Sequence, residues 1–148
     1  MTILSAIKTV LEAAATLLAT ATGGIYDFNE TGRIGVNRTN TPSAFDANGV
    51  IKPTILVRAR ALVPDFVLRD SSGQYSSARQ TIEVYYYQDS GYSTIATLKD
   101  RVYALLHETQ VTGAFLVSWA GGTGESFDYD INACVERDDY LVNTYRSV

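Results

Sequence analysis

The spacing of apolar residues changes abruptly within one stretch, TIEVYYYQDSGYSTIATLKDRVYALLH, which spans residues 81–107. In its first part, Ile82, Val84 and Tyr86 alternate with other residues, which is the two-residue period of a strand with one buried face. Beyond the break QDSG, the apolar residues follow the spacing of one helix face: Ile95, Leu98, Val102, Leu105 and Leu106. The sequence therefore predicts a strand over about 80–88 and a helix from Ser93, as N-cap, to about Glu108.

Strand alternation also divides the three consecutive tyrosines. Tyr86 shares the phase of the apolar positions and is predicted to lie in the core beneath the helices. Tyr85 and Tyr87 point to the opposite face of the strand, on the same side as Glu83. The three tyrosines are thus expected to lie on two different faces of one sheet.

The other apolar patterns predict a first helix and more strands. An amphipathic helix is expected over 2–20, stopped by two glycines at 23–24. A strand over 54–63, ended by Pro64, is expected to pair with the strand at 80–88 as an antiparallel hairpin. Ile55, Val57 and Ala59 are predicted on its core face, and Leu56, Arg58, Arg60 and Leu62 on the other. Further strands are predicted at 114–119, 127–135 and 140–146, with a bulge or turn at the sequence ERDD, 136–139.

This order of elements predicts the α+β class. Two helices are expected to pack on one face of a mainly antiparallel sheet, in the order α-ββ-α-ββ with an extra C-terminal strand. The sheet face that carries Ile55, Val57, Ile82, Val84 and Tyr86 is expected to meet the helices. The 148 residues are expected to form a single domain, 1–148.

Residues 27–53 form a long polar segment between the first helix and the first predicted strand. It is rich in Asn, Thr, Gly and Asp, and only 34–36 hints at a short strand. A polar connection of this length is unusual inside a compact domain. We expect either a surface loop or an arm that becomes ordered against a partner. Two of its arginines, Arg33 and Arg38, are assigned with it to a partner interface.

Motifs that carry chemistry are not evident. The single histidine, His107, lies where a helix C-terminus is predicted, and the single cysteine, Cys134, lies in a strand pattern that predicts burial. The sequence GGTGES at 121–126 has no lysine and no following helix, so a hairpin turn is predicted there rather than a phosphate loop. Acidic residues between Glu125 and Asp139 lack the spacing of a calcium loop. No catalytic, cofactor or metal residue is therefore predicted.

The predicted outer face of the sheet is the candidate interface. Arg58 and Arg60 on one strand face Glu83, Tyr85 and Tyr87 on the next, and Glu83 is expected to pair with an arginine across the hairpin. Tyr and Arg are enriched in protein–protein interfaces, whereas Lys is depleted. Two alternatives stay open: an ordinary exposed face, and a stacking platform for single-stranded nucleic acid.

Charge and hydropathy narrow these alternatives. The formal net charge is −4, whereas proteins that hold nucleic acid by its phosphates are usually basic. No apolar run is long enough to span a membrane. The N-terminal stretch has no basic leading region, and Lys8 and Glu12 interrupt its apolar residues, so a helix of the mature protein is expected rather than a signal peptide.

The strand IEVYYY, the break QDSGY and the following helix to Leu106 carry a family resemblance. Together with AFDANGVIKPTILVRA at 44–59, which leads into the first predicted strand, they resemble the tail-terminator or tail-completion (neck) proteins of tailed bacteriophages. The resemblance covers most of the chain as an order of elements. The segment 27–53 is longer than in the shortest members.

The resemblance implies a virion structural protein without enzymatic activity, assembled in the host cytoplasm. Such proteins form rings, usually hexamers, that end tail-tube growth and join the tail to head-completion proteins. DNA passes through the lumen without specific binding, and neither a cofactor nor a membrane is implied. The alternatives are a head-completion protein of another neck layer and the nucleic-acid module described above.

Overall fold

The computed structural model describes residues 2–70, 73–114 and 116–147, which form three α-helices and a six-stranded sheet. The helices are α1 (Ile3–Glu12), α2 (Ala15–Thr20) and α3 (Ser93–Leu106), with a short 3-10 turn, η1 (Pro42–Ala44). The strands are β1 (Gly24–Asp27), β2 (Thr54–Asp70), β3 (Gly73–Gln88), β4 (Leu116–Gly122), β5 (Ser126–Asp128) and β6 (Ala133–Ser147). Their order is β1-β2-β3-β6-β4, with β5 pairing to β6, and only β1 with β2 is parallel. The predicted α+β class is confirmed.

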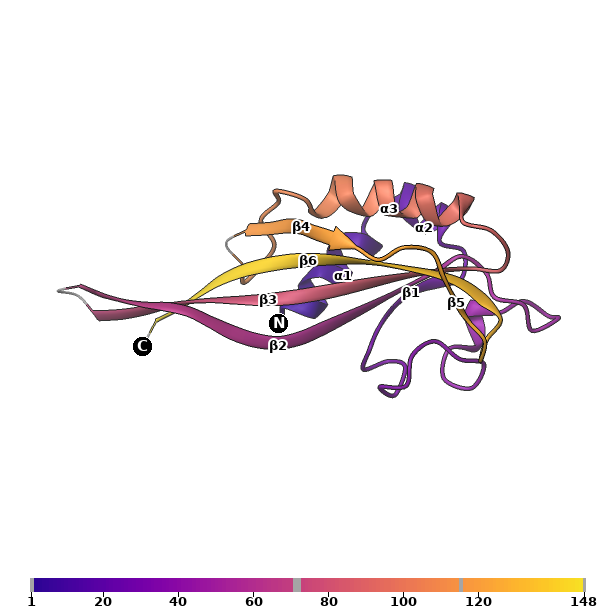
Figure 1. Ribbon diagram of the computed structural model, residues 1–148, viewed down its shortest axis with the longest axis horizontal. Coiled ribbons are helices and arrows are strands. Elements are labelled where there is room, and N and C mark those ends of the chain that lie inside the picture. The colour runs from indigo at the N-terminus through magenta and orange to yellow at the C-terminus, as the bar shows by residue number, and fades with distance from the viewer. Residues whose placement is uncertain (1, 71–72, 115, 148) are drawn as a thin grey trace.

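The helices cover one face of the sheet, and the core lies between the two layers (Figure 1). The five residues predicted to face the helices, which include Tyr86, are all fully buried. They pack against the apolar stripe of α3: Ile95, Leu98, Val102 and Leu106. Each such side chain contributes about 1.5–3 kcal/mol by leaving water. The predicted position of Tyr86 is therefore confirmed.

The start of α3 is capped from the preceding strand rather than by Ser93. Tyr92 occupies the N-cap position, and its side chain makes no capping bond. The amide oxygen of Gln88 instead accepts hydrogen bonds from the backbone N–H groups of Thr94 and Ile95, at 2.9 and 3.1 Å. This side chain satisfies donors that the first turn of a helix leaves free. The last residue of β3 thereby fixes the turn into α3.

The predicted first helix is two helices joined at a break. Ala14 has an extended backbone, with φ −88° and ψ 100°, between α1 and α2. The break lets Leu11 and Leu17, six residues apart, both lie fully buried, although that spacing does not fall on one face of a continuous helix. Arg101 on α3 donates to the carbonyl of Thr16 at 2.6 Å, which ties α2 to α3.

The short strand β1 follows the first helices and was not predicted. It pairs in parallel with the start of β2, Gly24 opposite Thr54 and Asp27 opposite Val57. Gly24 has a φ of +101°, which side chains rarely adopt. A Cβ at Gly23 would stand 2.0 Å from the Thr54 hydroxyl oxygen, so the chain needs glycine to come this close to β2.

Strands β2 and β3 form a hairpin far longer than predicted, and it projects beyond the rest of the sheet (Figure 1). The predicted end at Pro64 is wrong. Proline is tolerated in edge strands and at bulges, and β2 meets both conditions here, with a register shift between Pro64 and Phe66. A second shift between Ala59 and Leu62 places two residues of β2 opposite Thr81. Leu62 thus pairs with Gln80 on the helix side, not on the face of Arg58 as expected.

Strand β6 runs without a break through the predicted turn at 136–139. Its register with β3 is continuous from Cys134 to Ser147, so the predicted bulge is wrong. The apparent change of phase has two other causes. The predicted strand at 127–135 is divided into β5 and the start of β6 by a turn at 129–132, and both faces of β6 are covered at its start. Ala133 packs on one side of the sheet, whereas Cys134 and Tyr140 join the core beneath the helices.

The segment 28–53 lies on the sheet face opposite the helices (Figure 1). We call this segment the arm. It builds a second small core with the sheet, from Val36, Ala44, Phe45, Ile51, Leu56, Tyr87, Ile131 and Ala133. The sequence DANG at 46–49 forms a turn, because the Asp46 carboxylate accepts from the backbone N–H groups of Asn48 and Val50. No strand forms at the expected position 34–36, although this part of the arm is described.

Candidate subunit interface

The outer face of β2, β3 and β6 carries a network of charges centred on Glu83. Arg60 donates from Nε to Glu83 Oε1 at 2.9 Å, and this confirms the predicted pairing across the hairpin. The Tyr85 hydroxyl donates to Glu83 Oε2 at 2.7 Å, and Arg137 Nη1 lies 3.1 Å from the same oxygen. Arg137 also reaches Asp139, with Nε 3.1 Å from Oδ1. Three side chains therefore surround the Glu83 carboxylate, and Asp139 holds one of them, Arg137.

Glu83 is buried, and this burial alone would raise its pKa. The hydrogen bonds from Tyr85 and Arg60, and the charges of Arg60 and Arg137, outweigh burial and lower the pKa of Glu83. Burial and the bond to Glu83 raise the pKa of Tyr85 in turn. The carboxylate is thus ionised and the phenol neutral at pH 7, which gives this face a fixed charge pattern.

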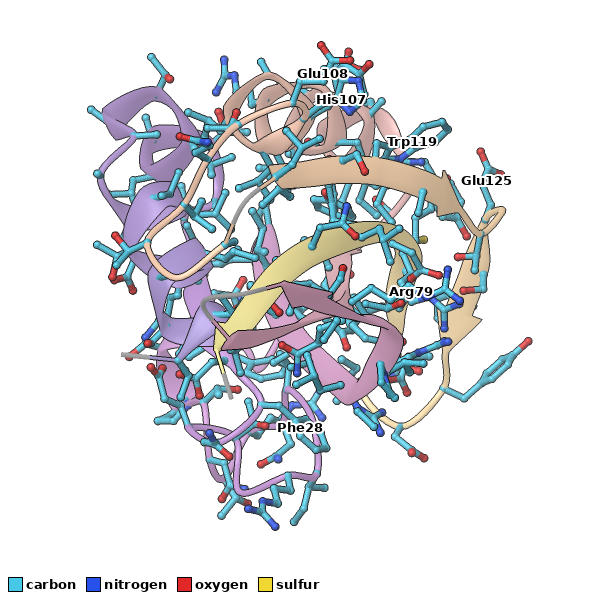
Figure 2. All side chains as sticks on the ribbon, turned by 90° about the vertical axis from the view of Figure 1, so that its left-hand side faces the viewer. Phe28, Arg79, His107, Glu108, Trp119 and Glu125 are labelled. Carbon is cyan, nitrogen blue, oxygen red and sulfur yellow. The ribbon has the colours of Figure 1, made fainter. Side chains whose placement is uncertain are left out.

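The other three predicted interface arginines occupy different environments. Arg58 is exposed, and its guanidinium lies 4.6 Å from the ring centre of Phe28, a residue of the arm labelled in Figure 2. Arg38 donates twice to the Gly49 carbonyl and stacks over Phe45, so it binds the arm to itself. Arg33 is exposed at φ +63°. The structure therefore groups Arg60 with Glu83 and Tyr85 but leaves Arg33 and Arg38 apart.

Tyr87 lies on the sheet face opposite the helices, as predicted, but this part of the face is covered rather than open. It is 6% exposed, because the arm packs over it together with Leu56. Burial raises the pKa of Tyr87 well above its ordinary value. Tyr85, two residues earlier, is half-buried and remains accessible at the edge of the arm.

A cleft of about 390 Å³ opens beside Tyr85 on this outer face. Tyr85 and Tyr87 form part of its wall, and the segment from Ser126 to Asp130 forms the rest with Val135. Tyr129 is 82% exposed and Phe127 is 40% exposed, and their rings meet edge to face at 4.9 Å. From the sequence, Asp128 and Asp130 were noted only as acidic residues without the spacing of a calcium loop. The alternation of aromatic and acidic residues in the sequence FDYD, 127–130, could have indicated this cleft.

A second cleft, of about 360 Å³, lies on the helix side. It is lined by Lys99, Asp100, Tyr103, Trp119 and Asp138. Burial raises the pKa of Asp138, although the ammonium of Lys99 lies 3.6 Å away and opposes this shift. The ammonium of Lys99 on α3 also lies 3.6 Å from Glu136. One cation thus faces two carboxylates of ERDD, which helps this acidic sequence to continue as a strand.

The β4 edge of the sheet is closed by the chain itself. The backbone N–H of Val117 donates to Thr109, and the N–H of Glu108 donates to the Val117 carbonyl. The backbone N–H of Trp119 donates to Nδ1 of His107 at 3.0 Å, and Figure 2 shows both side chains at this edge. His107 also stacks on Tyr103 at 4.6 Å. The single histidine is thus built into the structure of the edge.

The opposite edge of the sheet is open along the projecting hairpin. Strand β1 covers β2 only as far as Val57. From Arg58 onward, none of the strands described here pairs with the outer side of β2. Leu62 and Val63, 40% and 47% exposed, lie on this part of β2. An open strand edge with exposed apolar residues is typical of a surface that pairs with another chain.

Among the described residues, no group of three or more His, Cys, Asp or Glu side chains could hold a metal ion. None of the described helices is long and apolar enough to cross a membrane.

Comparison with known proteins identifies the fold. No protein-family model matches the sequence, and no curated protein matches it. Among solved structures, the chain is similar to one from the virion of a native gene transfer agent (GTA) particle, with a TM-score of 0.65 and 13% sequence identity. The match covers 97% of this chain and 95% of the other. At this identity, the likeness establishes a shared fold over nearly the full length of both chains.

Proposed function

We propose that the protein is a structural component of a phage-like virion, where it forms a ring at the head-proximal end of the tail. In this role it ends tail-tube assembly and joins the tail to the head-completion proteins. The ring is a hexamer of identical subunits, and DNA passes through its lumen. The observation that carries the proposal is the fold shared, over 97% of the chain, with a chain of a gene transfer agent virion.

Surface features of the chain support assembly with copies of itself. Arg58, Arg60 and Tyr85 lie on a face whose charges are fixed by Glu83 and Arg137. Fixed side chains lose little further freedom when a partner binds, which favours association. The net charge of −4 also suits a conduit wall that should not retain phosphates.

The arm is ordered within the single chain, which changes its expected role. It shares an apolar core with the sheet and has internal hydrogen bonds, so we do not propose that it folds upon assembly. It acts instead as a rigid spacer that presents part of the outer surface to a neighbouring subunit.

Native mass spectrometry of the full chain, alone and with the tail-tube protein of the same particle, tests this role. We expect a closed species of six copies, visible as a ring by negative-stain microscopy, which binds one end of the tube. A ring that binds head-completion proteins but not tubes would favour another neck layer. A chain that stays monomeric under both conditions would contradict the proposal.

The predicted interface is tested in the same assay. Arg58→Ala should reduce the fraction of ring without changing the melting temperature by more than about 2 °C, because this side chain is exposed. Asp89→Ala, a change of an exposed charge between β3 and α3, is the matched control and should leave the ring unchanged.

A further inference from the structure

The arm presents two neighbouring side chains that are not used within the chain. Ile34 is 78% exposed, and among the exposed large apolar residues that the structure describes only Tyr129 has a higher value. Arg33 is also exposed, and its guanidinium has neither an ion pair nor a ring partner among the described residues. Its φ of +63° is costly for a residue with a side chain. The backbone N–H of Arg33 donates to the Phe28 carbonyl at 3.0 Å, so this tip is held in place.

The cleft beside Tyr85 has the complementary chemistry. Its walls are aromatic, from Tyr85, Phe127 and Tyr129, and its rim carries Asp128 and Asp130. Asp128 is occupied, because its carboxylate accepts from the backbone N–H of Asp130 at 2.9 Å. The carboxylate of Asp130 has no partner among the described residues. Aromatic faces attract guanidinium groups, and a free carboxylate adds a charge-assisted hydrogen bond. The cleft therefore suits an arginine accompanied by an aliphatic side chain.

The tip and the cleft are built from different parts of the chain. The tip belongs to the arm, which packs on the outer face of the sheet, whereas the cleft is formed at β5 together with Tyr85 of β3 and Val135 of β6. Two different surfaces that fit one another produce head-to-tail contacts, and such contacts close into rings when the rotation between copies permits.

We propose that Arg33 and Ile34 of one copy dock into the cleft beside Tyr85 and Asp130 of the next copy. One contact of this kind covers both the exposed isoleucine and the exposed Tyr129, and it neutralises one unpaired charge on each copy. The occupant is a second copy because each chain carries one tip and one cleft with matching charge. This inference rests on the proposed ring and specifies the contact that builds it.

A charge exchange tests the contact by native mass spectrometry at matched concentrations. Arg33→Glu and Asp130→Arg should each lower the apparent association constant at least about tenfold, because each places like charges together. The double variant Arg33→Glu/Asp130→Arg should restore assembly. Arg33→Glu/Asp89→Arg has the same net charge, but its second change lies outside the cleft, so it should not restore assembly. Circular dichroism checks that every variant keeps its fold.

Cysteine cross-linking provides a second measurement. The pair Arg33→Cys/Asp130→Cys should give a ladder of covalent oligomers under oxidising conditions, and each single cysteine variant should not. A wild-type ring that Arg33→Glu leaves intact, or rescue by Asp89→Arg as strong as by Asp130→Arg, would overturn the contact and leave the ring standing. A wild-type chain that remains monomeric, alone and with tube protein, would overturn both proposals.

Discussion

Glu83 determines the chemistry of the outer sheet face at the scale of single residues. It is a buried carboxylate that accepts from Arg60 and Tyr85 and lies 3.1 Å from Arg137. Removing one member of such a network leaves the others partly unpaired, and unpaired buried groups are costly. The network therefore contributes both stability and a fixed charge pattern.

Glu83→Gln should lower the free energy of unfolding at pH 7 by on the order of 2 kcal/mol, the range for hydrogen bonds to charged groups. The folded-state pKa of Glu83 lies below its ordinary value, so its stabilisation is complete above the unfolded pKa, about 4.3. This stabilisation is lost as the pH falls through the folded-state pKa. The difference between wild type and variant should therefore shrink below about pH 5. Urea denaturation at several pH values measures this difference in the free energy of unfolding. A difference that does not change with pH would show that the charge of Glu83 is not its source.

Single residues also show where sequence reasoning reaches its limit. Alternation within one strand was enough to assign Tyr86 to the core and to pair Glu83 with an arginine. It could not assign Tyr87, because the residues that cover it, such as Phe45, come from an arm some forty positions earlier. A pattern in one strand states which face a side chain takes, but not what lies on that face.

The arm is the element that departs most from expectation. It resembles a disordered loop in composition, yet it is held by an apolar core and by Arg38, which donates to the Gly49 carbonyl at 3.0 and 2.8 Å. Its polar residues are used mostly in turns, where Asp and Asn side chains accept from backbone N–H groups.

Arg38→Ala should loosen the second half of the arm. It removes both bonds to Gly49 and the stacking on Phe45, so the local opening free energy should fall by about 1–2 kcal/mol. Hydrogen exchange of the isolated chain should then be roughly tenfold faster at Asp46 and Lys52, whose N–H groups bond within the arm. Thr39→Ala, at an exposed residue of the arm whose side chain makes no hydrogen bond among the described residues, is the control. Equal exchange in both variants would mean that Arg38 does not hold the arm.

Each error in the elements predicted from apolar periodicity has a physical cause. β1 is four residues long, too short for a pattern to stand out. At the start of β6 both faces are buried, so its apolar residues no longer alternate in one phase. The hairpin passes through Pro64 because nothing described pairs with its outer side. In contrast, α3 and the hairpin pairing of β2 with β3 were predicted from strong local patterns.

At the scale of the whole molecule, Arg60, Tyr85 and Tyr87 are not free to form the stacking platform that the sequence left open as an alternative. Tyr87 is covered by the arm, and the hydroxyl of Tyr85 is bound to Glu83. Arg60 is neutralised by the same carboxylate, and the net charge of −4 opposes phosphate binding.

Titration with single-stranded oligonucleotides should therefore give no saturable binding up to about 100 µM at low salt, whereas typical DNA-binding proteins bind non-specifically with a Kd of about 1–100 µM at physiological salt. Fluorescence anisotropy measures this directly. Binding that weakens steeply with added salt would contradict the prediction and favour the nucleic-acid alternative.

The two edges of the sheet differ in how readily they can pair with a strand of another chain. One edge is occupied from Val117 to Trp119 by the chain's own residues 107–109, whereas β2 is unpaired beyond Val57. If β2 of one copy paired with β2 of a second copy, the backbone groups at both open edges would be hydrogen-bonded. A third copy could then not pair at this edge. Backbone pairing through this edge can therefore yield a pair of copies but no longer array. A larger closed assembly must rely on side-chain contacts, which can be reversed by changing single charges.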